Sequence, residues 1–243
     1  MKKIISIIFA SFIVLFPIKS CLSSENSIGK RTVVVLFDGL FAELRSSSSN
    51  SNGIEKLNIA LRNNFNSGLK ISISSKVFQH HENEEAYRYI KSFSDIGKLV
   101  IIGYSLGGRS AIKLSKELLL PEDQIIDLLI QIDSVKANNN TLPTNVTSGI
   151  NYYQESTDFL EPQGVREMSG SRNINVETLL SDTTITHQNI DDNQYLMQII
   201  IKEIDNIKKT QKRNTDNKVI LNKNKEFDED IIKTIEENIK IFE

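Results

Sequence analysis

The chain has 243 residues, of which 25% are charged and 39% hydrophobic, and its formal net charge is −2 at pH 7. This length is enough for one α/β domain with a sizeable core, and the small net charge argues against a nucleic-acid partner. A single cysteine excludes an intrachain disulfide framework. The sequence offers neither a metal-ligand cluster nor a phosphate-cradling loop, so we expect no cofactor.

The first 21 residues resemble a secretory signal peptide. Two lysines follow Met1, and the apolar run from Ile4 to Ile18 is too short for a comfortable membrane span, although an uncleaved anchor is an alternative. Cys21 stands where a bacterial lipoprotein signal has its lipid-modified cysteine, but Lys19 departs from that pattern. We therefore expect an exported protein, either free or attached to a membrane through lipidated Cys21.

From residue 30 onward, apolar runs typical of strands alternate with helical stripes. The run from Thr32 to Phe37 is β-branched and continuous, as expected of a strand that is covered on both faces. Further strands are predicted at 69–78, 99–102, 127–133, 150–154 and 174–176, and helices at 54–65, 82–96, 106–120 and 190–208. Strands that alternate with helices form a mostly parallel sheet, so residues 30–209 are predicted to be one α/β domain.

The composition changes after Lys209. Residues 210–218 are polar and charged, as in a linker. A second apolar stripe with acidic neighbours follows, made of Phe227, Ile231, Ile235, Ile239 and Phe242. It predicts a charged C-terminal helical tail over 210–243 that docks on the domain or on a partner. An acidic polar face makes membrane association the less favoured interpretation.

The stretch from Lys98 to Gly108 carries the strongest functional signal. An apolar run leads into Gly103-Tyr-Ser-Leu-Gly107, and a helical pattern begins at once. Strand, sharp turn and helix, with glycines two residues on either side of a serine, form the nucleophile-elbow pattern G-x-S-x-G. We expect the serine of such a turn to adopt a strained backbone conformation with its hydroxyl held clear of the sheet, and the flanking positions to tolerate little more than a hydrogen. Ser105 is the predicted nucleophile, and a simple glycine-rich turn is the alternative.

Polar residues follow several of the predicted strands. In parallel sheets ligands bind beyond the carboxyl ends of the strands. Residues at these ends include a carboxylate, a serine and histidines, in the segments 38–40, 79–81, 105 and 133–134 and in the segment that leads to His187. A nucleophile, a base and an acid are therefore predicted at one edge of the sheet.

These features resemble the α/β-hydrolase superfamily, and within it the compact lipases and esterases. The resemblance covers residues 30–209 and rests on Gly103-Tyr-Ser-Leu-Gly107, on the chain order serine, aspartate, histidine, on Gly39 after the first strand, and on His187 shortly before the last helix. It implies a minimal α/β-hydrolase fold and a serine hydrolase that cleaves an ester or lipid substrate through an acyl-enzyme. The superfamily's substrate range is wide.

The base and the acid are assigned from this order. A serine hydroxyl needs a neighbouring base, and His187 is the predicted one. His80 and His81 are alternatives, because their strand is expected beside the elbow strand, but they precede Ser105 in the chain.

A carboxylate on the other ring nitrogen fixes the imidazole tautomer. Asp133, which ends an apolar run, is the predicted acid. Asp158 is the alternative, one strand later, where the superfamily more often supplies the acid; Glu155 and Asp182 are further candidates.

The oxyanion of the tetrahedral intermediate needs backbone donors. The first is the N–H of Leu106, next after the nucleophile. We expect the second to be the N–H of Leu40, in a loop where Asp38 stands in place of the histidine of the His-Gly turn found in many lipases; Asp38-Gly39 as a plain turn is the alternative. The polar loops 41–52 and 138–149 are expected near this edge, and they predict a shallow, open site; a disordered linker without function is the alternative for 41–52.

Two other groups of functions fit the sequence. The same residues can serve a thioesterase, an acyltransferase or a peptidase. A non-catalytic binding protein that retains the hydrolase scaffold is the other class. The sequence gives no indication of the oligomeric state.

Overall fold

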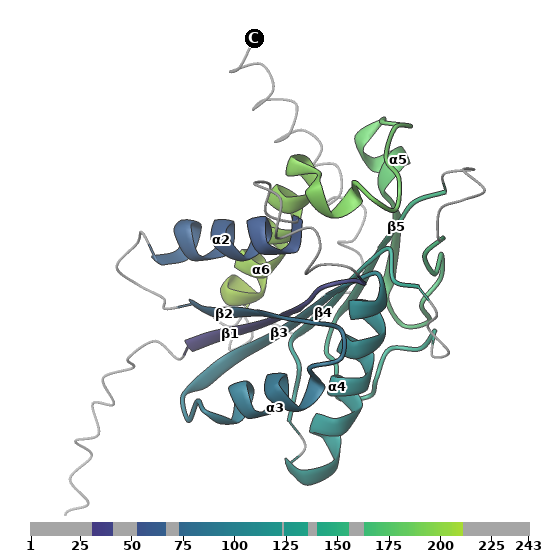
Figure 1. Ribbon diagram of the computed structural model, residues 1–243. Helices are drawn as coiled ribbons and strands as arrows, with labels where there is room; N and C mark the ends of the chain where they lie inside the picture. Colours follow the sequence, from purple (N-terminus) through teal and green to yellow (C-terminus); the bar gives the residue numbers. More distant parts are fainter. Residues whose placement is uncertain are drawn as a thin grey trace, which may run out of the picture.

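The computed structural model describes residues 31–40, 53–66, 73–122, 124–135, 140–155 and 163–210 (Figure 1). The predicted signal peptide with Cys21, residues 41–52, Asp158 and the predicted C-terminal tail from residue 211 lie outside these ranges. Within the described ranges, no helix combines the length and the apolar character that crossing a membrane requires.

The fold is built on a six-stranded, all-parallel sheet in the order β2-β1-β3-β4-β5-β6. The strands are β1 (Arg31–Phe37), β2 (Ile73–Phe78), β3 (Ile96–Tyr104), β4 (Leu128–Ile132), β5 (Gly149–Tyr153) and β6 (Arg172–Asn175). The helices are α2 (Gly53–Asn66), α3 (Asn83–Lys91), α4 (Leu106–Glu122), α5 (Val176–Leu180) and α6 (Gln194–Thr210), with a short 3₁₀ helix, η1 (Ile190–Asp192). The predicted α/β class is confirmed.

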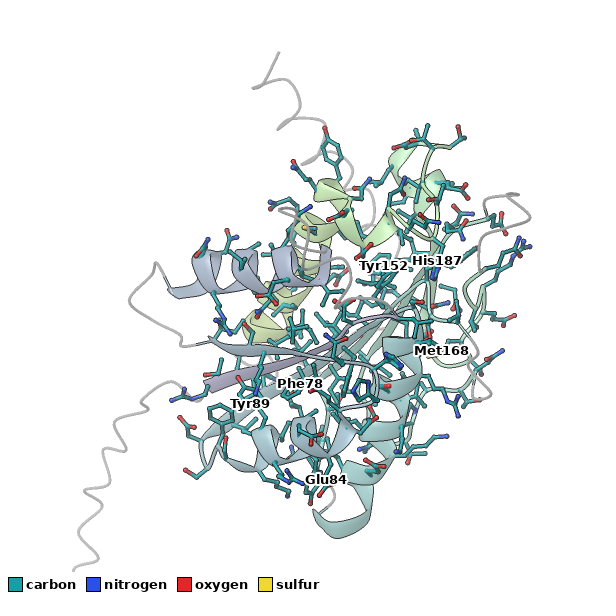
Figure 2. The ribbon with its side chains drawn as sticks, viewed as in Figure 1. Phe78, Glu84, Tyr89, Tyr152, Met168 and His187 are labelled. Atoms are coloured by element: carbon teal, nitrogen blue, oxygen red, sulfur yellow. The ribbon has the colours of Figure 1, made fainter. Side chains whose placement is uncertain are left out.

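Helices cover both faces of the sheet. Figure 1 shows α2 and α6 on one face and α3 and α4 on the other. Each pair closes its own apolar cluster: Ile54 of α2 and Ile200 of α6 belong to one, and Ala86 of α3 and Leu114 of α4 to the other. Figure 2 shows side chains filling both layers, with Phe78 on the α3 side. The central strands are buried on both sides, which explains their continuous apolar runs.

The register aligns the carboxyl ends of the central strands. Phe37 at the end of β1 pairs with Gly103 of β3. Ile132 at the end of β4 pairs with Tyr104 of β3 on one side and with Tyr152 of β5 on the other. The residues that follow β1, β3, β4 and β5 are therefore neighbours along one edge of the sheet.

The strand order corrects one expectation. The strand before His80 and His81 was expected beside the elbow strand, but β1 lies between β2 and β3. β1 is wholly apolar after Thr32 and takes an interior place, whereas β2 leaves Lys76 exposed, as suits an edge strand.

Several boundaries also differ from the prediction. α3 ends at Lys91, because Ile96 already pairs with Arg31 as the first residue of β3. α4 continues to Glu122, past Pro121, since a proline in the last turn interrupts only the final helical hydrogen bonds. α6 starts at Gln194, after Asn193, whose side chain accepts the Leu196 N–H and caps the helix.

The segment 140–149 also differs from expectation. We expected the whole loop 138–149 near the edge that carries Ser105. Instead, Asn145 accepts the Ile126 N–H, and the Thr147 N–H donates to Ile126, which lies before the amino end of β4. The chain must return to that end because β5 runs parallel to β4. This part of the loop therefore lies away from the serine.

Candidate active site

Ser105 occupies the sharp turn between β3 and α4. Its φ is 54°, a left-handed conformation that non-glycine residues adopt at an energetic cost. Its N–H donates to the Ile132 carbonyl of β4 (3.0 Å), and its own carbonyl accepts from the N–H groups of Gly108 (3.1 Å) and Val135 (3.2 Å). These three hydrogen bonds hold the strained residue in place.

The two glycines of the pattern stand where a side chain would collide with neighbouring backbone. A Cβ on Gly103 would lie 2.3 Å from the Gly107 carbonyl oxygen, and one on Gly107 would lie 2.4 Å from the Phe37 carbonyl oxygen. Neither neighbour is a side chain that can rotate away. The turn therefore requires glycine at both positions, and the spacing recognised in the sequence has a physical cause in the structure.

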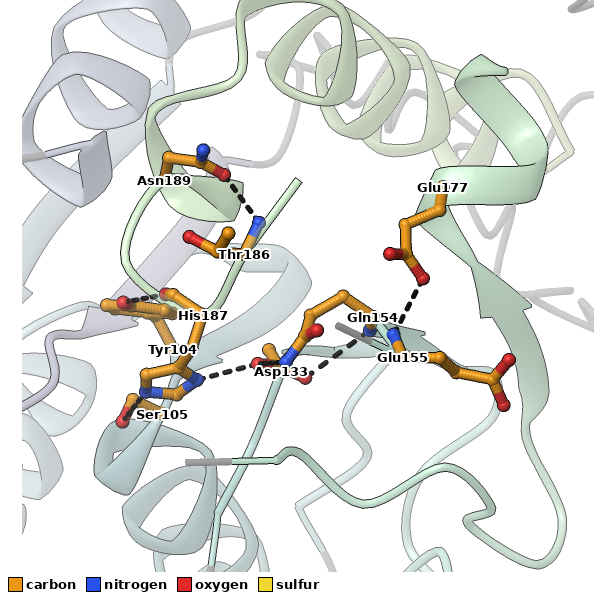
Figure 3. A network of polar contacts seen from close by, with 9 residues as sticks. All are labelled: Tyr104, Ser105, Asp133, Gln154, Glu155, Glu177, Thr186, His187 and Asn189. Atoms are coloured by element: carbon orange, nitrogen blue, oxygen red, sulfur yellow. Dashed lines mark hydrogen bonds and ion pairs between the residues drawn. The ribbon is translucent and has the colours of Figure 1, made fainter. Parts of the chain in front are cut away.

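His187 lies in the loop between α5 and η1, with its ring directed at Ser105 (Figure 3). Its Nε2 is 2.9 Å from Ser105 Oγ. Both side chains are largely buried.

Tyr104, the residue before the serine, fixes His187 in two ways. Its ring stacks on the imidazole at 5.4 Å between centroids and 28° between planes. Its hydroxyl donates to the backbone carbonyl of His187. Sequence reasoning missed this residue, because Tyr104 occupies a variable position of the G-x-S-x-G pattern.

Asp133 follows β4 and points at the other side of the imidazole. Its Oδ2 is 2.6 Å from His187 Nδ1, and its side chain is fully buried. Gln154, a residue the sequence did not single out, donates to the same oxygen from Nε2 (3.1 Å) and to Oδ1 from its backbone N–H (3.4 Å). A carboxylate only accepts, so the Nδ1 proton belongs to the imidazole, and Nε2 is left to accept the Ser105 hydroxyl proton.

Two of the other acid candidates, Glu155 and Asp182, make contacts elsewhere. The Glu155 carboxylate is exposed and lies 3.4 Å from Arg166. Asp182 accepts from the hydroxyl and the backbone N–H of Thr184, and these hydrogen bonds lower the pKa of its carboxyl. Asp158 lies outside the described residues.

The other two histidines follow β2. Their rings pack edge to face, and the His80 carbonyl accepts the hydroxyl of Ser110 on α4. In the part of the chain that the structure describes, the imidazole that hydrogen-bonds Ser105 is that of His187.

Of the two predicted oxyanion donors, Leu106 directly follows Ser105, and Leu40 follows Gly39, which lies against Ser105. Leu106 is the first residue of α4, where backbone N–H groups have no partner within the helix. Gly39 passes so close that an added Cβ would lie 3.0 Å from Ser105 Cβ. The Gly39 N–H donates to the buried carboxylate of Asp38 (2.7 Å). The glycine N–H is thus engaged, which leaves the N–H of Leu40 as the predicted donor from this loop.

The arrangement is a chain of hydrogen bonds from hydroxyl to imidazole to carboxylate. Such a chain lets the imidazole take the hydroxyl proton while the oxygen attacks an electrophile. Among the described residues, no group of three or more His, Cys, Asp or Glu side chains is placed to hold a metal ion.

A scan against models of known families finds no match, and a search of curated proteins finds no related sequence.

Proposed function

We propose that the protein is an exported serine hydrolase of the α/β-hydrolase fold, which cleaves carboxylic esters as lipases and esterases do. The observation that carries the proposal is the pair of distances at His187: 2.9 Å from Nε2 to Ser105 Oγ and 2.6 Å from Nδ1 to Asp133 Oδ2. The strained turn at Ser105, the parallel sheet and the histidine between the last strand and the last helix support it.

The proposed reaction runs through an acyl-enzyme. Ser105 Oγ attacks the ester carbonyl carbon while its proton passes to His187 Nε2. The oxyanion accepts hydrogen bonds from the N–H groups of Leu106 and Leu40. As the intermediate collapses, the C–O bond to the alcohol breaks, and His187 returns the proton to the leaving alkoxide. Water then attacks the acyl-enzyme by the same steps, and Asp133 stabilises the imidazolium throughout.

A fluorophosphonate that labels activated serines tests the proposal. Wild-type protein should form a covalent adduct on Ser105, and Ser105→Ala should form none. Ser110→Ala is the matched control, because Ser110 is a buried serine nearby on α4 whose hydroxyl donates to the His80 carbonyl rather than to His187. Folded wild-type protein without an adduct would contradict catalysis at Ser105 and favour a binding protein on the same scaffold.

A substrate panel then separates the reactions that Ser105 can perform. Nitrophenyl esters and matched thioesters of increasing acyl length give kcat/KM for each class. We expect the oxygen esters to be hydrolysed through Ser105. A strong preference for thioesters would replace the ester proposal by the thioesterase alternative.

Export is the second part of the proposal. The positive start, the apolar run to Ile18 and the position of Cys21 support it. Cell fractionation with mass spectrometry of the mature N-terminus tests it: the protein should lack its first residues and lie outside the cytoplasm. If Cys21 carries the lipid, Cys21→Ser should move the protein from the membrane fraction to the soluble one.

A further inference from the structure

The end of strand β5 makes an unusual contact with Asp133. Ile132 and Tyr152 form the last pair between β4 and β5, and the Asp133 N–H continues the ladder to the Tyr152 carbonyl (2.7 Å). A regular parallel ladder would next send the Gln154 N–H to a backbone carbonyl. Here it donates to the side-chain Oδ1 of Asp133 (3.4 Å), because the chain turns away at Asp133 with a φ of 42°. The carboxylate thus takes the place of a main-chain carbonyl.

The Gln154 side chain adds a second donor. It is almost fully buried, and its Nε2 lies 3.1 Å from Asp133 Oδ2, the oxygen that also accepts the His187 Nδ1–H (Figure 3). One carboxylate oxygen is therefore held by the Gln154 backbone, and the other is shared between the Gln154 amide and the imidazole. Two fixed donors set both the position and the plane of the carboxylate.

The far side of the carboxylate is closed by backbone. A Cβ on Gly164 would lie 2.0 Å from Asp133 Oδ1. The following residue is tied down on both sides: the Val165 N–H donates to the Ser134 carbonyl (2.8 Å), and its carbonyl accepts the Asn151 amide (2.7 Å). The carboxylate therefore sits between a pinned segment and Gln154, with little freedom to rotate.

We infer that Gln154 is a positioning residue of the reaction: its amide holds the Asp133 carboxylate in the orientation that orders His187 for proton transfer. The inference rests on the proposed function. Because the amide carries no charge, it orients the carboxylate without competing with the imidazolium for the role of its counter-ion. A misplacement of a catalytic group by a fraction of an ångström is costly, so loss of this donor should reduce turnover more than substrate binding.

Gln154→Met tests the inference, because methionine keeps the length of the side chain and the backbone donor but removes the amide. We expect kcat to fall about 10- to 30-fold, the effect of losing one hydrogen bond to a buried charge, while KM stays within about twofold. Gln131→Met is the matched control, since Gln131 is a buried glutamine on β4 whose amide donates to the Gly108 carbonyl instead. If the two variants lose stability alike and both keep their kcat, the inference is wrong.

A double-mutant cycle asks whether Gln154 acts through Asp133. In the Asp133→Asn background, Gln154→Met should change the rate of fluorophosphonate labelling of Ser105 by no more than about twofold. Losses that multiply in the double variant would show a merely structural role and overturn the inference. Should Gln154→Met not fold, Gln154→Asn carries the same cycle, because it keeps a buried amide but withdraws it by roughly 1.5 Å, the length of one C–C bond.

A measurement independent of activity separates this inference from the proposed function. The proton between His187 Nδ1 and Asp133 should give a downfield NMR resonance that Gln154→Met shifts or broadens and Gln131→Met leaves in place. An unlabelled Ser105 in wild-type protein would refute the hydrolase proposal and, with it, a role of Gln154 in the reaction, even if Gln154→Met still shifts the resonance. A resonance unchanged by Gln154→Met would refute the role of Gln154 alone.

Discussion

Ser105 and Asp133 leave neighbouring strands in the same way. Each follows the last residue of its strand, β3 or β4, and each adopts a positive φ, 54° and 42°. Each donates its N–H to a carbonyl at the end of the neighbouring strand: the serine to Ile132, the last residue of β4, and the aspartate to Tyr152, the last residue but one of β5. Similar turns therefore follow two neighbouring strands. The serine side chain hydrogen-bonds one nitrogen of the His187 imidazole, and the aspartate side chain hydrogen-bonds the other.

The two turns differ in which glycines leave space for the residue at the turn. At Ser105 the space comes from Gly103 and Gly107, within the same stretch of sequence. At Asp133 it comes from Gly164, which approaches from beyond β5 and comes closest to the carboxylate itself. The first turn is encoded locally, whereas the second depends on a segment far along the chain. Substitutions at the two turns should accordingly have different consequences.

The largest expected effect tests whether the second turn carries the acid. Asp133→Asn replaces an acceptor by an amide that can donate to Nδ1, which favours the wrong imidazole tautomer, so kcat should fall about 10³- to 10⁴-fold. Asp158→Asn should leave kcat within about threefold. Steady-state ester hydrolysis measures both, with thermal unfolding to show that each variant is folded. The opposite ranking would move the acid to Asp158.

A smaller effect separates the two kinds of glycine. In Gly107→Ala the new Cβ meets the backbone at the end of β1, which cannot yield, so we expect a loss of about 2–3 kcal/mol in unfolding free energy. In Gly164→Ala the Cβ comes closest to the Asp133 carboxylate and also lies 2.8 Å from the backbone carbonyl carbon of Asp133. The carboxylate is displaced from His187, so kcat should fall about 10- to 100-fold. Stability should fall less than in Gly107→Ala, because the three nearest atoms at Gly107 are all backbone and at Gly164 only one is. Denaturant unfolding and ester hydrolysis are measured on both variants. Equal effects on the two quantities would show that the turns do not differ in this way.

The sequence predicted the fold class and most elements, because buried strands and amphipathic helices can be recognised from the spacing of their apolar residues. It misplaced β2, since the order of strands depends on how strands distant in sequence pair. It also missed α5, a short helix capped by Asn175, whose side chain accepts the Thr178 N–H. A single turn of helix gives too few apolar repeats to be distinguished from a loop.

The residues of the candidate site also differ in whether the local sequence identifies them. Ser105 was predictable because its glycines lie within two residues of it. His187 and Asp133 were predicted from chain order and from their positions relative to predicted elements. These criteria did not exclude the other acidic candidates. Gln154 and Tyr104 carry no local signal, since a glutamine after a strand and a tyrosine within it are ordinary in sequence. Their contacts with Asp133 and His187 arise only when the strands are side by side.

The smallest expected effect concerns the histidine, whose backbone carbonyl is bound by Tyr104 at the end of β3, the strand of the serine. Tyr104→Phe keeps the ring against the imidazole but removes the donor to the His187 carbonyl. Leaving that buried carbonyl without this donor should cost about 1–2 kcal/mol of stability and, through a looser imidazole, about three- to tenfold in kcat. Tyr89→Phe is the control, because Tyr89 packs against Phe78 and Phe93 on the α3 side of the sheet. If kcat is unchanged in Tyr104→Phe, the stacked ring and the bond to Asp133 are enough to hold His187, and the orientation of the base is set from the acid's side alone.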